Sequence, residues 1–88
     1  MKYILRFSET FLDELDKLSG KDRGIVLNKL YILRNNPKHP SLRTKKLEGH
    51  HELFESSVNM DIRLVWRYEN NTIILMLDVG HHDILKKY

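Results

Sequence analysis

The hydrophobic period of this 88-residue chain changes near its middle, and that change limits the folds it can adopt. Between residues 8 and 36, apolar side chains recur every three or four positions, the spacing of amphipathic helices. From residue 52 onward they alternate or form a short continuous run, which is typical of strands. The chain is too short to bury two cores. We therefore expect a single α+β domain spanning residues 1–88.

One strand and two helices are expected in the first half. Residues 2–7 alternate in polarity, which predicts a strand. Ser8 can then cap a helix, with Gly20 as the residue that follows its C-terminus. A second helix is expected to begin near Asp22 and to end at the Asn-Asn-Pro sequence of residues 35–37, because the residue before a proline disfavours the helical conformation. So brief a connection predicts a helical hairpin.

Three strands are expected in the second half. Residues 52–58 and 61–68 have strand-like patterns, and residues 72–79 are almost continuously apolar, which predicts a central strand buried on both faces. Two asparagines at 70–71 are expected to form a tight hairpin turn, because asparagine tolerates the positive φ that such turns need. The order β-α-α-β-β-β predicts a helical hairpin packed on a mostly antiparallel four-stranded sheet.

Two arginines share one face of the strand expected at 61–68. Arg63 and Arg67 lie opposite the apolar face that carries Trp66. Two guanidinium groups on the same face of a strand could clamp one phosphate through their forked donors. The alternative is that both arginines are exposed strand residues, paired with acidic side chains of the neighbouring strand at 52–58.

Basic charge is concentrated in one loop-like segment. The whole chain has 15 Lys and Arg against 12 Asp and Glu, a net charge of +3. Residues 37–51 contain three histidines and four of the cations against a single acid, Glu48. The four cations are Lys38, Arg43, Lys45 and Lys46. A basic cluster beside histidines suggests phosphate binding, and a solvated loop is the alternative interpretation.

A His-His-Asp sequence at residues 81–83 directly follows the last expected strand. Histidine exchanges protons near neutral pH, so these side chains are candidates for proton transfer. Adjacent side chains of an extended chain point to opposite sides, and we therefore do not expect His81 and His82 to bind one metal ion together. Asp61 is a candidate acid, base or orienting group, and equally a turn residue.

Several classes of protein and site are excluded by what the sequence lacks. The chain has no cysteine, which excludes disulfides and cysteine-ligated metals. It has no glycine-rich phosphate loop, no Gly-x-Ser-x-Gly sequence and no His-Glu-x-x-His sequence. No apolar run approaches the ~20 residues of a membrane span, and residues 1–6 lack the pattern of a signal peptide. We expect a cytoplasmic protein without contact to a membrane.

The order and length of these features resemble the RelE/ParE superfamily of toxins from type II toxin–antitoxin systems. The resemblance covers essentially the whole chain. It rests on Lys-Lys-Leu-Glu-Gly at 45–49, Asp-Ile-Arg-Leu-Val-Trp-Arg at 61–67 and Asp-Val-Gly-His-His-Asp at 78–83. The aspartate and the Gly-x-His sequence are most similar to YafQ-type toxins, whereas the Arg-Leu-Val-aromatic run is more similar to RelE and YoeB.

The resemblance implies a ribosome-dependent endoribonuclease that inhibits translation by cutting messenger RNA, without a metal or other cofactor. In this chemistry a ribose 2′-OH attacks the adjacent phosphate and leaves a 2′,3′-cyclic phosphate, which requires a base, a cation and an acid. By position, Arg63 would stabilise the developing charge, His82 would be the general acid or base, and Asp61 would transfer or orient a proton. Six further residues are expected to bind RNA: Arg43, Lys45, Lys46, Arg67, Lys86 and Tyr88.

The implied partners are a cognate antitoxin, the ribosome with its messenger RNA, and operator DNA through the toxin–antitoxin complex. Two positions depart from the family pattern. Lys86 stands where many relatives have an aromatic residue that stacks on a base, with Tyr88 two residues beyond. Many relatives also have an arginine on the strand that corresponds to residues 52–58, and here Phe54 or Glu55 stands in its place. The alternatives are a ParE-like inhibitor of DNA gyrase and a catalytically inactive relative that binds nucleic acid.

Overall fold

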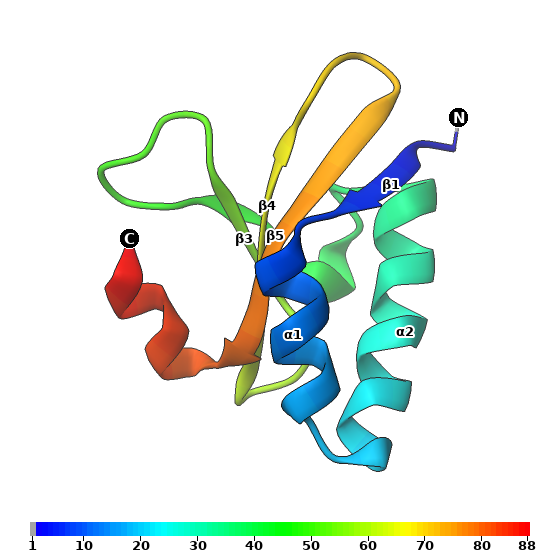
Figure 1. Ribbon diagram of the computed structural model, residues 1–88. Coiled ribbons are helices and arrows are strands. Elements are labelled where there is room, and N and C mark those ends of the chain that lie inside the picture. The colour runs from blue at the N-terminus through cyan, green and yellow to red at the C-terminus, as the bar shows by residue number, and fades with distance from the viewer. Residues whose placement is uncertain (1) are drawn as a thin grey trace.

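Two helices cover one face of a five-stranded sheet, and the C-terminal segment lies on the other side (Figure 1). The computed structural model describes residues 2–88, so Met1, the first residue of the expected domain, lies outside the described residues. In chain order the elements are β1 (Ile4–Phe7), α1 (Glu9–Lys17), α2 (Gly20–Asn35), the 3₁₀ turn η1 (Pro40–Leu42), β2 (Lys45–Lys46), β3 (Phe54–Ser57), β4 (Ile62–Tyr68), β5 (Ile73–His81) and the 3₁₀ segment η2 (His82–Lys87).

The strand order is β1-β5-β4-β3-β2. β1 runs parallel to β5, with Ile4 opposite Ile73, and the other three pairings are antiparallel. The predicted α+β class and the mostly antiparallel sheet are confirmed, and the last long strand is an interior strand, between β1 and β4. The sheet has five strands where the sequence predicts four, because Lys45 and Lys46 pair with β3 as a short edge strand. Two residues are too few to carry a strand periodicity.

The N-terminal ends of both helices are capped by serines. Ser8 accepts a hydrogen bond from the backbone N–H of Phe11 at 3.0 Å, as predicted. The expectation for Gly20 is wrong, because Gly20 is the first residue of α2 rather than the end of α1. Ser19 provides the physical reason, since its hydroxyl accepts from the N–H of Asp22 at 3.1 Å and starts α2 earlier than expected. Neither helix within residues 2–88 is long and apolar enough to cross a bilayer.

The main core lies between the helices and the sheet. Trp66 is fully buried there and stacks on Phe54 with 4.7 Å between ring centroids, which confirms the apolar face predicted for β4. The indole N–H donates to the hydroxyl of Ser56 at 2.9 Å, and Ser56 shares a 2.7 Å hydrogen bond with Thr44. Thr44 also donates to the carbonyl of Pro37 at 2.8 Å. This chain of hydrogen bonds fastens the segment before β2 to the sheet.

A second apolar cluster covers the opposite face of the sheet. Its centre is Val65, which is fully buried although it lies between two arginines. The loop of residues 47–53 and the C-terminal segment supply the covering side chains, and Figure 1 shows both on the side away from the helices. The members around Val65 are Leu47, Leu53, Leu77, Ile84, Leu85 and Tyr88.

The connection between β4 and β5 differs from the expected tight turn. Residues 69–72 separate the strands, and neither asparagine has positive φ. Instead, Oδ1 of Asn70 accepts hydrogen bonds from the N–H groups of Thr72 and Ile73 at 2.8 and 3.0 Å. With four connecting residues, the side-chain bonds of Asn70 close the turn without a left-handed backbone.

Candidate functional site

The two arginines of β4 lie on the face away from the helices, as predicted, but they do not share a cavity. Arg63 lines a cavity at the β3–β4 turn, whereas Arg67 lines one near the loop of residues 47–53. Val65 and the apolar cluster over it separate them. The structure therefore does not form the two-arginine phosphate clamp suggested by their spacing on one strand.

The alternative role for these arginines, pairing with acidic side chains of β3, is not formed either. Neither Arg63 nor Arg67 makes an ion pair within residues 2–88. Arg63 is held by backbone carbonyls instead, because its Nη1 donates to Asn59 at 2.7 Å and to Ile62 at 3.3 Å. Its positive charge thus stays uncompensated on a half-buried side chain.

We call the cavity at the β3–β4 turn the turn cavity, with a volume of about 280 Å³. Its lining residues come from η1 and the residue after it, from the end of β3, from the turn itself and from the start of β4: Ser41, Arg43, Ser57, Val58, Asn59, Met60 and Arg63. The structure brings Arg43 and Arg63 together here, although they are 20 positions apart in the chain. Arg43 has left-handed backbone dihedrals, φ 47° and ψ 44°, directly after η1.

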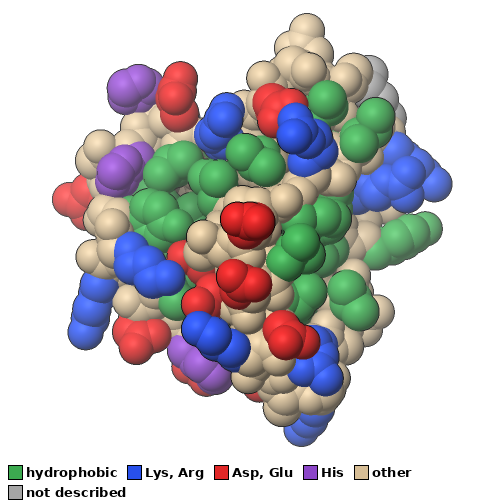
Figure 2. Space-filling view, viewed as in Figure 1, with side chains coloured by type: hydrophobic (Ala, Val, Ile, Leu, Met, Phe, Trp, Pro, Cys, Tyr) green, Lys and Arg blue, Asp and Glu red, His purple; other side chains and the backbone are tan. Residues whose placement is uncertain are grey.

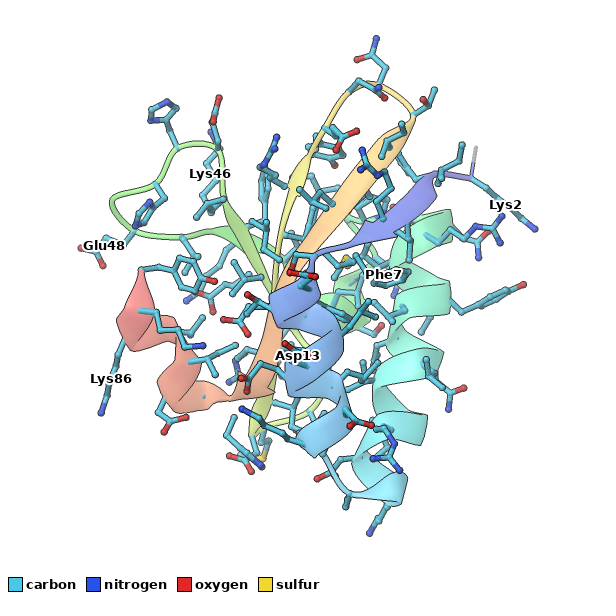
Figure 3. The ribbon with its side chains drawn as sticks, viewed as in Figure 1. Lys2, Phe7, Asp13, Lys46, Glu48 and Lys86 are labelled. Carbon is cyan, nitrogen blue, oxygen red and sulfur yellow. The ribbon has the colours of Figure 1, made fainter. Side chains whose placement is uncertain are left out.

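Two further cavities meet at Lys46, and we call them the lysine cavities. One, of about 390 Å³, is lined by Lys45, Lys46, Leu47, Glu48, Glu55, Leu85 and Tyr88. The other, of about 310 Å³, is lined by Lys46, His51, Glu52, Phe54, Arg67 and Tyr68. Figure 3 labels Lys46 on the loop side of the sheet, with Glu48 farther along the same loop. Three of the predicted RNA-binding cations therefore lie close together, accompanied by carboxylates.

Asp61 and the histidines are arranged differently from the implied pairing. Asp61 binds His81, with 2.7 Å between Oδ2 and Nδ1, and both side chains are more than half exposed. His82 begins η2, is exposed, and makes no side-chain hydrogen bond to the part of the chain that the structure describes. Gly80 of β5 lies opposite Arg63 of β4 in the sheet, and His81 and His82 are the two residues that follow Gly80.

The last residues of the chain are anchored on a buried carboxylate that the sequence analysis does not single out. Asp78 is fully buried, and its Oδ2 accepts hydrogen bonds from Nζ of Lys87 and from the hydroxyl of Tyr88, each at 3.1 Å. Burial and the nearby charge of Asp78 raise the pKa of Tyr88 to about 12. The sequence signal that could have identified Asp78 is its position as an acidic residue inside the otherwise apolar run of residues 72–79.

The two C-terminal residues expected to bind RNA face different surroundings. Lys86 points away from the sheet into solvent (Figure 3). Tyr88 packs in the second apolar cluster, and its ring meets His50 edge-on with 6.2 Å between centroids. The Tyr88 ring thus lines a lysine cavity, whereas Lys86 does not reach it.

The surface in Figure 2 mixes Lys and Arg with Asp and Glu rather than presenting one sign of charge. Across the described residues 2–88, no group of three or more His, Asp or Glu side chains is arranged to hold a metal ion. The positive charge relevant to a site is therefore local, in the turn cavity and around Lys46.

No protein-family model and no curated protein matches this sequence. Solved structures do match over almost the whole chain. A toxin–antitoxin complex, RelBE2 of Mycobacterium tuberculosis, contains a chain with 24% identity and a TM-score of 0.79, with 93% of this chain and 100% of that chain covered. YafQ from Escherichia coli has 15% identity and a TM-score of 0.78, with coverages of 96% and 98%. The intact E. coli RelBE complex has 25% identity and a TM-score of 0.71, with coverages of 89% and 94%.

These similarities show that the chain has the fold of RelE and YafQ toxins. The resemblance inferred from its motifs is therefore confirmed at the level of the fold.

Proposed function

We propose that this protein is the toxin of a type II toxin–antitoxin system, a cytoplasmic single-domain endoribonuclease that cuts messenger RNA on the ribosome and inhibits translation. The observation that carries the proposal is Arg63, a cation without an ion pair in residues 2–88, on the face of a RelE-like sheet away from the helices. Its Nη1 is fixed by two carbonyls, which leaves its remaining donors for a phosphate. The reaction needs no metal ion.

The proposed chemistry uses groups at the end of β5 beside Arg63. A base removes the proton of a ribose 2′-OH, O2′ forms a bond to phosphorus, and the bond from phosphorus to O5′ breaks. An acid then protonates O5′, which leaves a 2′,3′-cyclic phosphate. Arg63 stabilises the charge of the phosphorane. His82, two residues after Gly80 at the end of β5, is the general acid or base. Asp61, two residues before Arg63, is the orienting or proton-transfer partner.

The remaining cations provide a path for the RNA backbone. Lys45, Lys46 and Arg67 line the lysine cavities, and Arg43 lines the turn cavity. Lys86 extends from the C-terminal segment toward solvent, where it would meet RNA or ribosome outside the cavities. The ring of Tyr88 offers a stacking surface beside Lys46.

A protein partner is supported by exposed apolar side chains of β1 and of the two helices. Ile4, Phe7, Leu12, Leu27 and Tyr31 are between 40% and 62% exposed, and they come from β1, α1 and α2. Exposed apolar surface of this kind is typical of an interaction site. We assign it to a cognate antitoxin, and operator DNA would be bound through that complex.

The alternative is a ParE-like gyrase inhibitor or an inactive relative that binds nucleic acid. Two observations favour it: Lys86 replaces an aromatic residue and points away from the cavities, and Asp61 is bound to His81 rather than His82. In that case Arg63 and His82 would have structural roles only.

Primer-extension mapping of messenger RNA, with purified protein with and without ribosomes and with excess chelator, tests the proposal. We expect cleavage that requires ribosomes, survives chelator and disappears in Arg63→Ala and His82→Ala at unchanged Tm. The matched control is Arg6→Ala, which removes an exposed arginine of the edge strand β1 that is paired with Glu69. Absence of cleavage by folded, antitoxin-free protein would refute the endoribonuclease, and supercoiling by gyrase would then be measured.

A further inference from the structure

The turn cavity contains two guanidinium groups and no acidic group that balances them. Arg43 and Arg63 both line it, and neither makes an ion pair with any carboxylate of residues 2–88. Asp61 follows the lining residue Met60 in sequence, but its carboxylate is engaged by His81 at 2.7 Å. Two like charges at one cavity repel each other unless an anion lies between them. An anion in this cavity would therefore meet two positive charges and no carboxylate among the lining residues.

The backbone of Arg43 is held by its neighbours, while its side chain makes no hydrogen bond or ion pair within residues 2–88. Leu42 is fully buried in the main core. Thr44 is fastened through Ser56 to the indole of Trp66. Between them Arg43 adopts positive φ, a conformation that costs energy for a residue with a side chain. Glycine would be the unstrained choice at this position, so packing alone gives no reason for an arginine.

The side chain of Arg63, on the β4 side of the cavity, is held by backbone carbonyls. Its Nη1 is tied to the carbonyls of Asn59 and Ile62, and its other donors make no hydrogen bond within the described chain. Ser57, opposite Arg63 in the β3–β4 register, adds a hydroxyl to the same cavity. The guanidinium groups of Arg43 and Arg63, with the hydroxyl of Ser57 as a neutral donor, provide the kind of donor set that a phosphate group requires.

We infer that the turn cavity binds one phosphodiester group of a nucleic acid between Arg43 and Arg63, with the hydroxyl of Ser57 as a third donor. We identify this phosphate as the one that reacts, and that identification rests on the function proposed above. Arg43, rather than Arg67, is then the second cation on the phosphate held by Arg63. The Asp61–His81 pair and His82 lie beside this phosphate at the end of β5.

NMR spectra of the arginine Nε–Hε groups test the site directly, with inorganic phosphate and a 2′-O-methyl RNA trinucleotide as probes. We expect the signals of Arg43 and Arg63 to shift together with one dissociation constant, and the signal of Arg67 to stay unchanged with inorganic phosphate. If the trinucleotide binds more tightly than inorganic phosphate, the ligand is a phosphodiester. Equal affinity for the two probes would identify free phosphate as the ligand and overturn the assignment to a nucleic acid. No saturable shift at Arg43 would overturn the inference.

The variant of choice is Arg43→Gly, because glycine accepts positive φ and the fold should keep its Tm. We expect at least tenfold weaker binding of both probes, with Arg6→Gln as a control of equal charge change and unaltered binding. Messenger RNA cleavage on ribosomes then separates this inference from the proposed function. Phosphate binding at Arg43 by a protein that does not cleave would refute only the enzyme. Cleavage by Arg43→Gly within twofold of the wild type would refute the role of the turn cavity.

Discussion

Replacement of Lys87 by methionine probes how the buried carboxylate of Asp78 anchors the C-terminal segment. Asp78 has no exposed surface, and its carboxylate accepts from the N–H of Val79, from Nζ of Lys87 and from the hydroxyl of Tyr88. Methionine retains the length of the side chain and removes the ammonium group. Two neutral donors then remain for a carboxylate that water does not reach.

The structure sets the magnitude of the expected loss. A hydrogen bond to a charged group contributes about 1.5–3 kcal/mol, and removal of one partner of a buried ion pair costs about 3–5 kcal/mol. The side chain of Lys87 is 50% exposed, so solvent screens this pair and lowers the value. We expect a loss of about 1–2 kcal/mol in the free energy of unfolding, which lowers the Tm of a domain of this size by about 4–16 °C.

Urea unfolding monitored by the fluorescence of the buried Trp66 measures this loss. The matched control is Lys86→Met, the neighbouring lysine, which is exposed and points into solvent. Adding Asp78→Asn to Lys87→Met should recover part of the stability, because the amide carries no charge to compensate. Equal unfolding free energies for Lys87→Met and Lys86→Met would refute the anchoring role of the ion pair.

Three further changes have defined outcomes. Because the pKa of Tyr88 is about 12 in the folded protein and about 10 when unfolded, the free energy of unfolding should fall as pH rises from about 10 to 12, and Tyr88→Phe should flatten that fall in urea titrations. Gly80→Ala places a Cβ 2.6 Å from Cγ2 of Ile84, so thermal melts should show a loss of about 1–3 kcal/mol. Ser56→Ala leaves the buried indole N–H of Trp66 unpaired, and should cost about 1–3 kcal/mol in urea unfolding.

The alternation of β4 could be predicted because it depends only on neighbouring residues. Apolar side chains at every second position placed Trp66 toward the helices and Arg63 on the other face, and both placements are found. The edge strand β2 could not be predicted, since two lysines have no period and their conformation depends on pairing with β3. Gly20 was misassigned because two local signals compete there, and the Ser19 cap prevails.

The candidate site was predicted in its residue types more than in its contacts. Arg43 and Arg63 meet because η1 and the β3–β4 turn fold together, and no local pattern connects positions so far apart. His81 and His82 are identical in type, and only the geometry at the end of β5 determines which of them reaches Asp61. The catalytic roles of Arg63, His82 and Asp61 stay predictions until cleavage is measured.

The parallel pairing of β1 with β5 also controls when this protein can fold during its own synthesis. Ile4 pairs with Ile73, so β1 has no strand partner until the chain has been made as far as β5. The helical hairpin emerges early, but the sheet that buries its apolar side is completed only by the last strand. Nascent chains arrested before residue 72 should therefore stay sensitive to protease, and the site beside Arg63 can assemble only after β5 has been synthesised. The folded domain, and with it any function of the site beside Arg63, is thus delayed until β5 has been made.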